Sequence, residues 1–217
     1  MELLSRFIAF WILITLSPII IIISILSLIF QGSPIFYKQD RVGYRHNLFK
    51  MYKFRTMIKN SGDLIVKSKD SRITALGRIL RKTKIDEIPQ LLNIIKGEMR
   101  FIGPRPEVPE YFDKNTFQFL YKIKPGLSDY ASIMLRDETK ILLKIGGDNP
   151  YTKLLPIKLE LAEYYSRKKS FYLDLKLVTI TIIAIIFPKF SSRVLIIPRL
   201  TKDLPKIKGF LNKYLFN

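Results

Sequence analysis

Residues 72–106 read RITALGRILRKTKIDEIPQLLNIIKGEMRFIGPRP, and the adjacent carboxylates Asp86 and Glu87 lie at the centre of this stretch. Pro89 suits the first turn of a helix, where its missing N–H costs nothing, and Gly97 suits the position after a helix ends. The pattern therefore predicts a helix that begins at Pro89, with both carboxylates just before its N-terminus. Such an end carries partial positive charge and unsatisfied N–H groups, which favour a bound phosphate.

A strongly basic run precedes the two carboxylates and contains Arg78, Arg81, Lys82 and Lys84. Carboxylates that can act as a nucleophile or metal ligand, together with guanidinium groups, suit phosphate chemistry. A structural alternative exists, because Thr83 and Asp86 also fit a capping box at a helix start. Taken alone, the local pattern favours capping over catalysis.

The composition indicates a polyanionic partner. Lys and Arg number 37 against 18 Asp and Glu, so the formal charge of +19 favours nucleic acid, an anionic membrane face or phosphorylated ligands. Hydrophobic residues make up 48% of the chain, which favours the membrane over nucleic acid. The absence of cysteine excludes disulfides, thiolate catalysis and cysteine-built zinc sites, and the single His46 disfavours a Ser-His-Asp triad.

An uncharged apolar run extends over residues 7–30. As a straight helix it would be about 36 Å long, enough to cross a bilayer core of about 30 Å, so the pattern predicts a transmembrane helix. Pro18 would bend such a helix, and Ser17 can bond a freed carbonyl, so the run could also enter and leave by one face. Basic residues on both sides of the run favour the second arrangement, with both ends cytoplasmic.

Two short apolar and aromatic runs, at 35–39 and 49–54, predict a β-hairpin. At its end, Lys53 and Arg55 alternate with apolar residues and would lie on one strand face, which fits phosphate binding and a solvated edge strand equally well. Arg105 lies between two prolines that restrict its backbone, so its guanidinium is well placed to bind phosphate bidentately.

The remaining segments predict local structure. Ser71 or Thr74 would cap a helix that runs to Lys82, and Gly77 within it indicates a close approach of backbone or ligand. The further expectations are a loop over 60–71, a helix over 107–120, a short strand over 131–136 and a helix over 154–169.

The C-terminal part is apolar and basic. Residues 177–187 are too few to span a membrane and predict core or interfacial structure. Beyond them apolar residues recur at helical spacing among lysines, at Leu200, Leu204, Ile207, Leu211 and Tyr214. This pattern fits an amphipathic helix in the membrane interface, and it also fits a helix packed on the catalytic domain.

In their order along residues 5–126, these segments resemble the bacterial sugar transferases known as monotopic phosphoglycosyl transferases. The motifs that carry the resemblance are Ser17-Pro18, Gly32-Ser33-Pro34-Ile35-Phe36, Asp40-Arg41-Val42-Gly43, Lys53-Phe54-Arg55-Thr56-Met57, Arg72-Ile73-Thr74, Gly77-Arg78, Asp86-Glu87-Ile88-Pro89-Gln90, Leu91 with Asn93, Gly97, Gly103-Pro104-Arg105-Pro106 and Lys124-Pro125-Gly126. The ordered set favours a catalytic role for Asp86 over capping.

The resemblance implies an enzyme that transfers a sugar 1-phosphate from a nucleotide-sugar, usually a UDP-sugar, to polyprenol (undecaprenyl) phosphate. It implies Asp86 as the nucleophile, an aspartyl-phosphosugar intermediate and release of UMP. Glu87 would be its partner, as Mg²⁺ ligand or base, with Asp86 beside the same ion. The candidate phosphate-binding cations are Arg41, Lys53, Arg55, Arg78 and Arg105.

The expected fold is α+β and mainly helical. It comprises a re-entrant membrane helix over 1–33 that is bent at Ser17 and Pro18, a catalytic domain with a β-hairpin over 34–169, and a membrane-interfacial segment over 170–217. The resemblance implies a monotopic protein on the cytoplasmic face of the bacterial inner membrane, which contacts lipid and initiates a polysaccharide or glycoconjugate. A homodimer is compatible with the sequence, and no nucleic-acid partner is expected.

Two alternatives come from other classes of protein. A single-pass membrane scaffold explains the apolar run and the charge, but it does not explain Asp86-Glu87 beside Pro-Arg-Pro. A basic nucleic-acid-binding module leaves the apolar run unexplained. Within the resemblance, residues 127–132 read LSDYAS where many members carry a Gly-Trp-Ala-Gln-like stretch, so the sugar donor could differ from the commoner ones.

Overall fold

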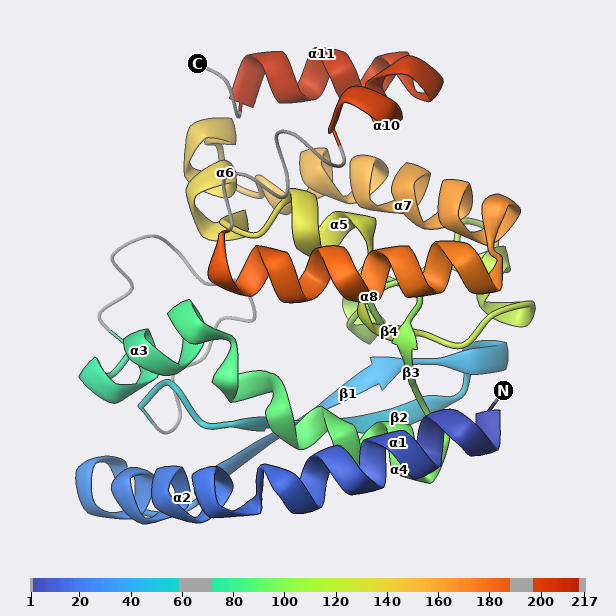
Figure 1. The fold of residues 1–217 in the computed structure, drawn as a ribbon. Helices are drawn as coiled ribbons and strands as arrows, with labels where there is room; N and C mark the ends of the chain where they lie inside the picture. The colour runs from blue at the N-terminus through green and yellow to red at the C-terminus, as the bar shows by residue number, and fades with distance from the viewer. Residues whose placement is uncertain (1, 59–71, 188–196, 215–217) are drawn as a thin grey trace. The chain divides into compact units, whose positions relative to one another are not determined.

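The computed structural model describes residues 2–58, 72–187 and 197–214 (Figure 1). These residues form two compact units: unit 1 contains 2–58, 72–101 and 106–127, and unit 2 contains 102–105, 128–187 and 197–214. Helices dominate, and the strands form a sheet of β1 and β2 and a sheet of β3 and β4, which confirms the mainly helical α+β class. The loop expected over 60–71 lies outside the described residues, and the functional boundaries at 33 and 169 stay a prediction.

Unit 1 begins with two apolar helices, α1 (Glu2–Thr15) and α2 (Ser17–Gln31), which are bent by 59° relative to each other. Pro18 lies in the first turn of α2, where proline starts a helix but cannot continue the preceding one. In the described part of the chain, no single helix is long and apolar enough to cross a membrane, and only α1 and α2 counted together reach that length and composition. The predicted bend is therefore confirmed, while the membrane topology stays a prediction.

Both ends of the α1–α2 pair are attached to the rest of unit 1. At the start, the carboxylate of Glu2 accepts a hydrogen bond from Nζ of Lys124 at 2.8 Å. At the other end, the buried guanidinium of Arg55 donates to the carbonyl oxygens of Gln31 and Gly32, the latter at 2.7 Å.

The predicted hairpin is confirmed. Strands β1 (Phe36–Val42) and β2 (Leu48–Phe54) pair antiparallel, with Phe36 opposite Phe54. Helices α1 and α4 (Leu91–Lys96) pack together, as Figure 1 shows. The main core of unit 1 joins the hairpin to these helices through Ala9, Phe49, Met51, Leu91, Ile94 and Met99.

Helix α3 (Ala75–Thr83) begins as predicted, because the Thr74 hydroxyl accepts a hydrogen bond from the Gly77 N–H at 2.9 Å. A 3-10 helix, η2 (Ile85–Gln90), follows and leads directly into α4. Gly97 ends α4 with φ of 79°, in the left-handed region that glycine adopts without strain, so the predicted stop is confirmed.

The helix expected over 107–120 is wrong. Beyond β3 (Arg100–Ile102), the chain forms two short 3-10 helices, η3 (Pro109–Tyr111) and η4 (Gln118–Tyr121), and then β4 (Gly126–Ser128). Between η3 and η4, the Asp113 carboxylate accepts a hydrogen bond from the Thr116 N–H at 2.9 Å, a local turn that competes with helix. A further 3-10 helix, η1 (Tyr44–His46), connects β1 to β2.

Unit 2 is helical, and the strand expected over 131–136 is wrong. Asp129 and Ser132 form a capping box that starts α5, since the Asp129 carboxylate accepts from the Ser132 N–H at 2.7 Å. The helix expected over 154–169 is confirmed by α7. The helices of unit 2 are α5 (Tyr130–Met134), α6 (Glu138–Ile145), α7 (Tyr151–Lys168), α8 (Phe171–Ile186), α10 (Ile197–Asp203) and α11 (Pro205–Tyr214).

The apolar face of the last two helices is covered within unit 2. Leu200, Leu204, Ile207 and Leu211 are all buried. The Asp203 carboxylate accepts hydrogen bonds from the Tyr164 hydroxyl and from Nζ of Lys168, both at 2.6 Å, which attaches α10 to α7. Of the two readings of this segment, the structure therefore supports the packed helix over the interfacial one.

Two helical glycines differ in their surroundings, which gives a matched test of the fold. A Cβ at Gly77 would lie 2.1 Å from the carbonyl oxygen of Thr56, whereas a Cβ at Gly209 would meet nothing within 4 Å. We expect Gly77→Ala to reduce the free energy of unfolding by about 1–3 kcal/mol, because backbone must move. Gly209→Ala should raise it by about 0.5–1 kcal/mol.

Thermal and denaturant unfolding of both variants beside the wild type measures these changes. Equal effects of the two substitutions would contradict the close approach of Gly77 to Thr56.

Candidate active site

Asp86 and Glu87 lie in the first turn of η2. The prediction that a helix starts at Pro89, with the carboxylates before it, is wrong: Pro89 lies inside η2, whose tight turn begins directly after Lys84. Lys84 adopts a left-handed conformation with φ of 62°, which separates α3 from η2. The capping alternative is also wrong, because the Thr83 hydroxyl donates to the carbonyl of Ile79 at 2.9 Å, within α3.

Asp86 is buried, with 6% of its surface exposed. Its Oδ1 atom is shielded from solvent and has no hydrogen-bond partner among the described residues. Burial raises the pKa of the Asp86 carboxyl above its ordinary value, and the charge of Glu87 adds to the rise, while Lys53, Lys84 and Arg81 oppose it. A carboxylate in this state is more basic than an exposed one.

Lys53 and Glu87 form an ion pair, with Nζ 3.2 Å from Oε1. The pair joins β2 to η2, two elements that pack against each other. The structure therefore brings Lys53, Asp86 and Glu87 together, as the sequence predicted.

Arg81 and Lys84 also act on Asp86, although the sequence reasoning selected Arg78 from the same basic run. Nε of Arg81 donates to the Thr56 hydroxyl at 2.7 Å, which holds the guanidinium over the end of the hairpin. Arg78 is exposed on α3. The signal that could have identified Arg81 and Lys84 is their closeness to Asp86 along the chain.

Arg55 and Arg41 make hydrogen bonds within unit 1, and their predicted phosphate binding stays a prediction. Arg55 donates to main-chain carbonyls at the end of α2, including that of Ser33 at 3.3 Å. Arg41 donates to the carbonyl of Pro106 at 3.1 Å and to the side chain of Gln39 at 2.7 Å. The Arg55 guanidinium thus bonds main-chain carbonyls, whereas that of Arg41 bonds one carbonyl and the side chains of Gln39 and Glu107.

Arg105 belongs to unit 2, where its N–H donates to Oδ2 of the buried Asp129 at 3.3 Å. Asp129 thus fixes the backbone of the Pro-Arg-Pro segment while it caps α5. It lies in the stretch 127–132, where the sequence departs from the family pattern. The prediction that the Arg105 side chain binds phosphate stays a prediction.

Asn93, which belongs to the motifs of the resemblance but was assigned no role from the sequence, is fully buried. Its Oδ1 accepts from the N–H of Tyr52 at 3.2 Å, and its Nδ2 donates to the carbonyl of Lys50 and to Glu98, both at 2.7 Å. Asn93 therefore fastens α4 to the edge of β2, which keeps Lys53 within reach of Glu87. An asparagine inside an apolar helical stretch was the available signal.

The site suits a hard cation only in part. In the described ranges, no group of three or more His, Asp or Glu side chains gathers around one point. Asp86 and Glu87 do supply adjacent carboxylates, and the unpartnered Oδ1 of Asp86 is the type of ligand that Mg²⁺ takes together with phosphate oxygens and water. The residues present therefore fit an ion shared with a phosphorylated substrate.

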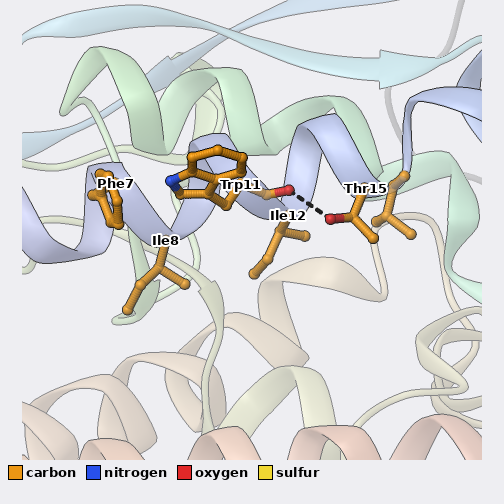
Figure 2. Close-up of a pocket in the computed structure, with 6 residues that line it drawn as sticks. Phe7, Ile8, Trp11, Ile12 and Thr15 are labelled. Atoms are coloured by element: carbon orange, nitrogen blue, oxygen red, sulfur yellow. Dashed lines mark hydrogen bonds between the residues drawn. The ribbon is translucent and has the colours of Figure 1, made fainter.

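A separate apolar hollow lies on α1. Figure 2 shows its lining of Phe7, Ile8, Trp11, Ile12 and Thr15, with the Thr15 hydroxyl donating to the carbonyl of Trp11 at 2.9 Å. This lining carries no titratable group, so the hollow cannot perform the chemistry of Asp86.

Comparisons with known proteins agree with the resemblance. The sequence model of a family described as bacterial sugar transferase matches residues 2–188. A UDP-N-acetylgalactosamine-undecaprenyl-phosphate N-acetylgalactosaminephosphotransferase of Aeromonas hydrophila is 33% identical over 174 residues, which cover 76% of this chain and 38% of the relative. The uncharacterized sugar transferase EpsL of Bacillus subtilis (strain 168) is 36% identical over 156 residues, which cover 70% and 69%.

A UDP-glucose:undecaprenyl-phosphate glucose-1-phosphate transferase of Escherichia coli (strain K12) is 31% identical over 180 residues. The match covers 79% of this chain and 37% of that relative, so the chain spans well under half of two of these three proteins.

The raised pKa of Asp86 predicts how stability depends on pH. The folded state holds the Asp86 proton more tightly than the unfolded state, so this group's contribution to stability falls as pH rises from the ordinary value of 3.8 through the raised pKa. We expect Asp86→Asn to raise the melting temperature at neutral pH, and the gain to shrink towards acid pH. Thermal unfolding of both proteins across a pH series measures it.

Asp113→Asn is the control, because hydrogen bonds from Thr116 lower the pKa of Asp113. This variant should show the opposite sign, with stability lost at neutral pH. A gain for Asp86→Asn that grows towards acid pH would contradict the raised pKa of Asp86.

Proposed function

The chain belongs to the bacterial sugar transferase family, and from that premise we propose that it transfers a sugar 1-phosphate from a UDP-sugar to polyprenol phosphate. The observation that carries the proposal is the buried Asp86, with an unpartnered carboxylate oxygen beside the Lys53–Glu87 ion pair. The names of two relatives support the substrate class, since each name mentions a UDP-sugar and undecaprenyl phosphate.

The reaction proceeds in two displacements at phosphorus. A carboxylate oxygen of Asp86 attacks the phosphorus next to the sugar, the bond to the nucleotide's other phosphate breaks, and UMP leaves with the bonding electrons. An oxygen of polyprenol phosphate then attacks the phosphorus of the aspartyl-phosphosugar. The bond to Asp86 breaks and the carboxylate is restored.

The surroundings of Asp86 support this role. Burial makes the carboxylate more basic and hence a stronger nucleophile, while Lys53, Lys84 and Arg81 favour its ionised form. The same cations can balance charge on the phosphoryl oxygens. Asp86 and Glu87 would hold Mg²⁺, which supplies further charge neutralisation when bound.

The attachments of α1 and α2 support a re-entrant placement in the membrane. Glu2 at the start of the pair and Gln31 at its end both contact charged side chains of unit 1, those of Lys124 and Arg55. A compact polar unit cannot lie on both sides of a bilayer, so both ends share one side. We infer a monotopic protein on the cytoplasmic face of the inner membrane, in contact with lipid through α1 and α2.

UMP release tests the reaction and the nucleophile together. The full chain is assayed with a panel of UDP-sugars, undecaprenyl phosphate and Mg²⁺. We expect release with one donor, and a loss of about a thousandfold or more in Asp86→Asn, because the amide is not a nucleophile. The exposed Asp113→Asn is the matched control and should retain activity.

Equal release by wild type and Asp86→Asn would remove Asp86 from the chemistry. No release of UMP by wild type with any donor would count against the proposed function. If one UDP-sugar does react, it identifies the sugar that the enzyme transfers.

Cysteine labelling tests the topology, and the absence of natural cysteine makes single introduced thiols unambiguous. We expect Leu3→Cys, at an exposed position in the first turn of α1, and Lys38→Cys, at an exposed position beyond α2, to react with an impermeant reagent from the same side as Lys122→Cys. Reaction of positions 3 and 38 from opposite sides would establish a spanning helix and overturn the re-entrant model.

A further inference from the structure

Gln90 is an unusual residue in the interior of unit 1. No part of it is exposed, yet neither its Nε2 nor its Oε1 has a hydrogen-bond partner among the described residues. A buried amide without partners destabilises a protein, because its lost hydrogen bonds to water are not replaced. Such groups are rare in folded proteins, and each requires an explanation.

The position of Gln90 beside the two carboxylates suggests an explanation for its unsatisfied amide. Gln90 is the last residue of η2, whose first turn contains Asp86 and Glu87. A 3-10 helix has three residues per turn, so side chains three positions apart lie one above the other. Gln90 therefore lies on the same face as Glu87, one turn further along, and that face meets Lys53 on β2.

A purely structural role does not account for the amide. The structural amide of unit 1 is that of Asn93, three residues later, whose hydrogen bonds to Tyr52, Lys50 and Glu98 satisfy both its oxygen and its nitrogen. Gln90 has the same chemistry and the same complete burial without those bonds. Glu87, its neighbour on the helix face, is engaged by Lys53.

We propose that Gln90 is a substrate-binding residue that donates a hydrogen bond from Nε2 to a non-bridging oxygen of the phosphoryl group transferred to Asp86. The inference rests on the proposed function. A phosphoryl oxygen is an acceptor, which matches the unsatisfied donor, and Gln90 follows Asp86 by four residues in η2, slightly more than one turn. Together with the nearby cations, this amide stabilises charge on the phosphoryl oxygens as the bond to Asp86 forms and breaks.

The test is Gln90→Met, which keeps the side-chain length and replaces the amide by an apolar group. Because the amide is unsatisfied without substrate, we expect the substrate-free melting temperature of the full chain to stay unchanged or rise. Because a donor to the phosphoryl group is lost, kcat for UMP release should fall about a hundredfold. Gln90→Glu keeps the shape of the side chain but replaces the donor by an acceptor, so its kcat should fall at least as far.

Gln118→Met is the matched control, since Gln118 is exposed on another 3-10 helix, and its kcat should equal that of wild type. A kcat of Gln90→Met within about twofold of wild type would overturn the inference, and so would a fall in stability that accompanies the fall in kcat. A wild-type chain without activity contradicts the proposed function itself, whereas active wild type with active Gln90→Met contradicts only this inference.

Discussion

The side chain of Asn93 takes the place of a neighbouring strand at the edge of β2, and the arrangement of unit 1 depends on it. Its amide bonds the backbone of Lys50 and Tyr52 from within α4. Helix α4 in turn supports α1 on one side and continues η2 on the other. One buried amide therefore sets the distance between the strand that carries Lys53 and the turn that carries Asp86.

What could be predicted from the sequence depended on local signals. The hairpin, the Thr74 cap, the close approach at Gly77 and the stop at Gly97 follow from turn residues and backbone conformation. The site required tertiary information: Arg55 and Arg41 are cations by sequence, but their carbonyl partners lie far along the chain. Two predictions were wrong, the helix over 107–120 and the strand over 131–136. In these segments Asp113 and Asp129 accept hydrogen bonds from backbone N–H groups, and the spacing of apolar residues does not reveal such bonds.

Two residues of η2 have buried polar atoms without hydrogen-bond partners among the described residues, which lowers the free energy of unfolding. Asp86 has an ionisable oxygen without a partner, and Gln90 leaves a whole amide unsatisfied, within six residues of helix. Folded proteins concentrate such features where a ligand will complete them. Asn93 and Arg55 stabilise the surrounding backbone, since the amide of Asn93 bonds the carbonyl of Lys50 and the guanidinium of Arg55 bonds that of Gly32.

The attachment of α1 has a consequence for biosynthesis. Beyond α2, the partners of α1 in unit 1 come later in the chain, and among the described residues they include β2, α4 at residues 91–96, and Lys124. When the ribosome has just synthesised α1 and α2, these later partners do not yet exist. The apolar side chains of the two helices then have no other part of the protein to pack against. In the proposed re-entrant placement, the bilayer receives α1 and α2 before the rest of unit 1 has been synthesised. That placement implies that membrane delivery precedes folding of unit 1, and that a chain kept from the membrane at that stage exposes its longest apolar run to water.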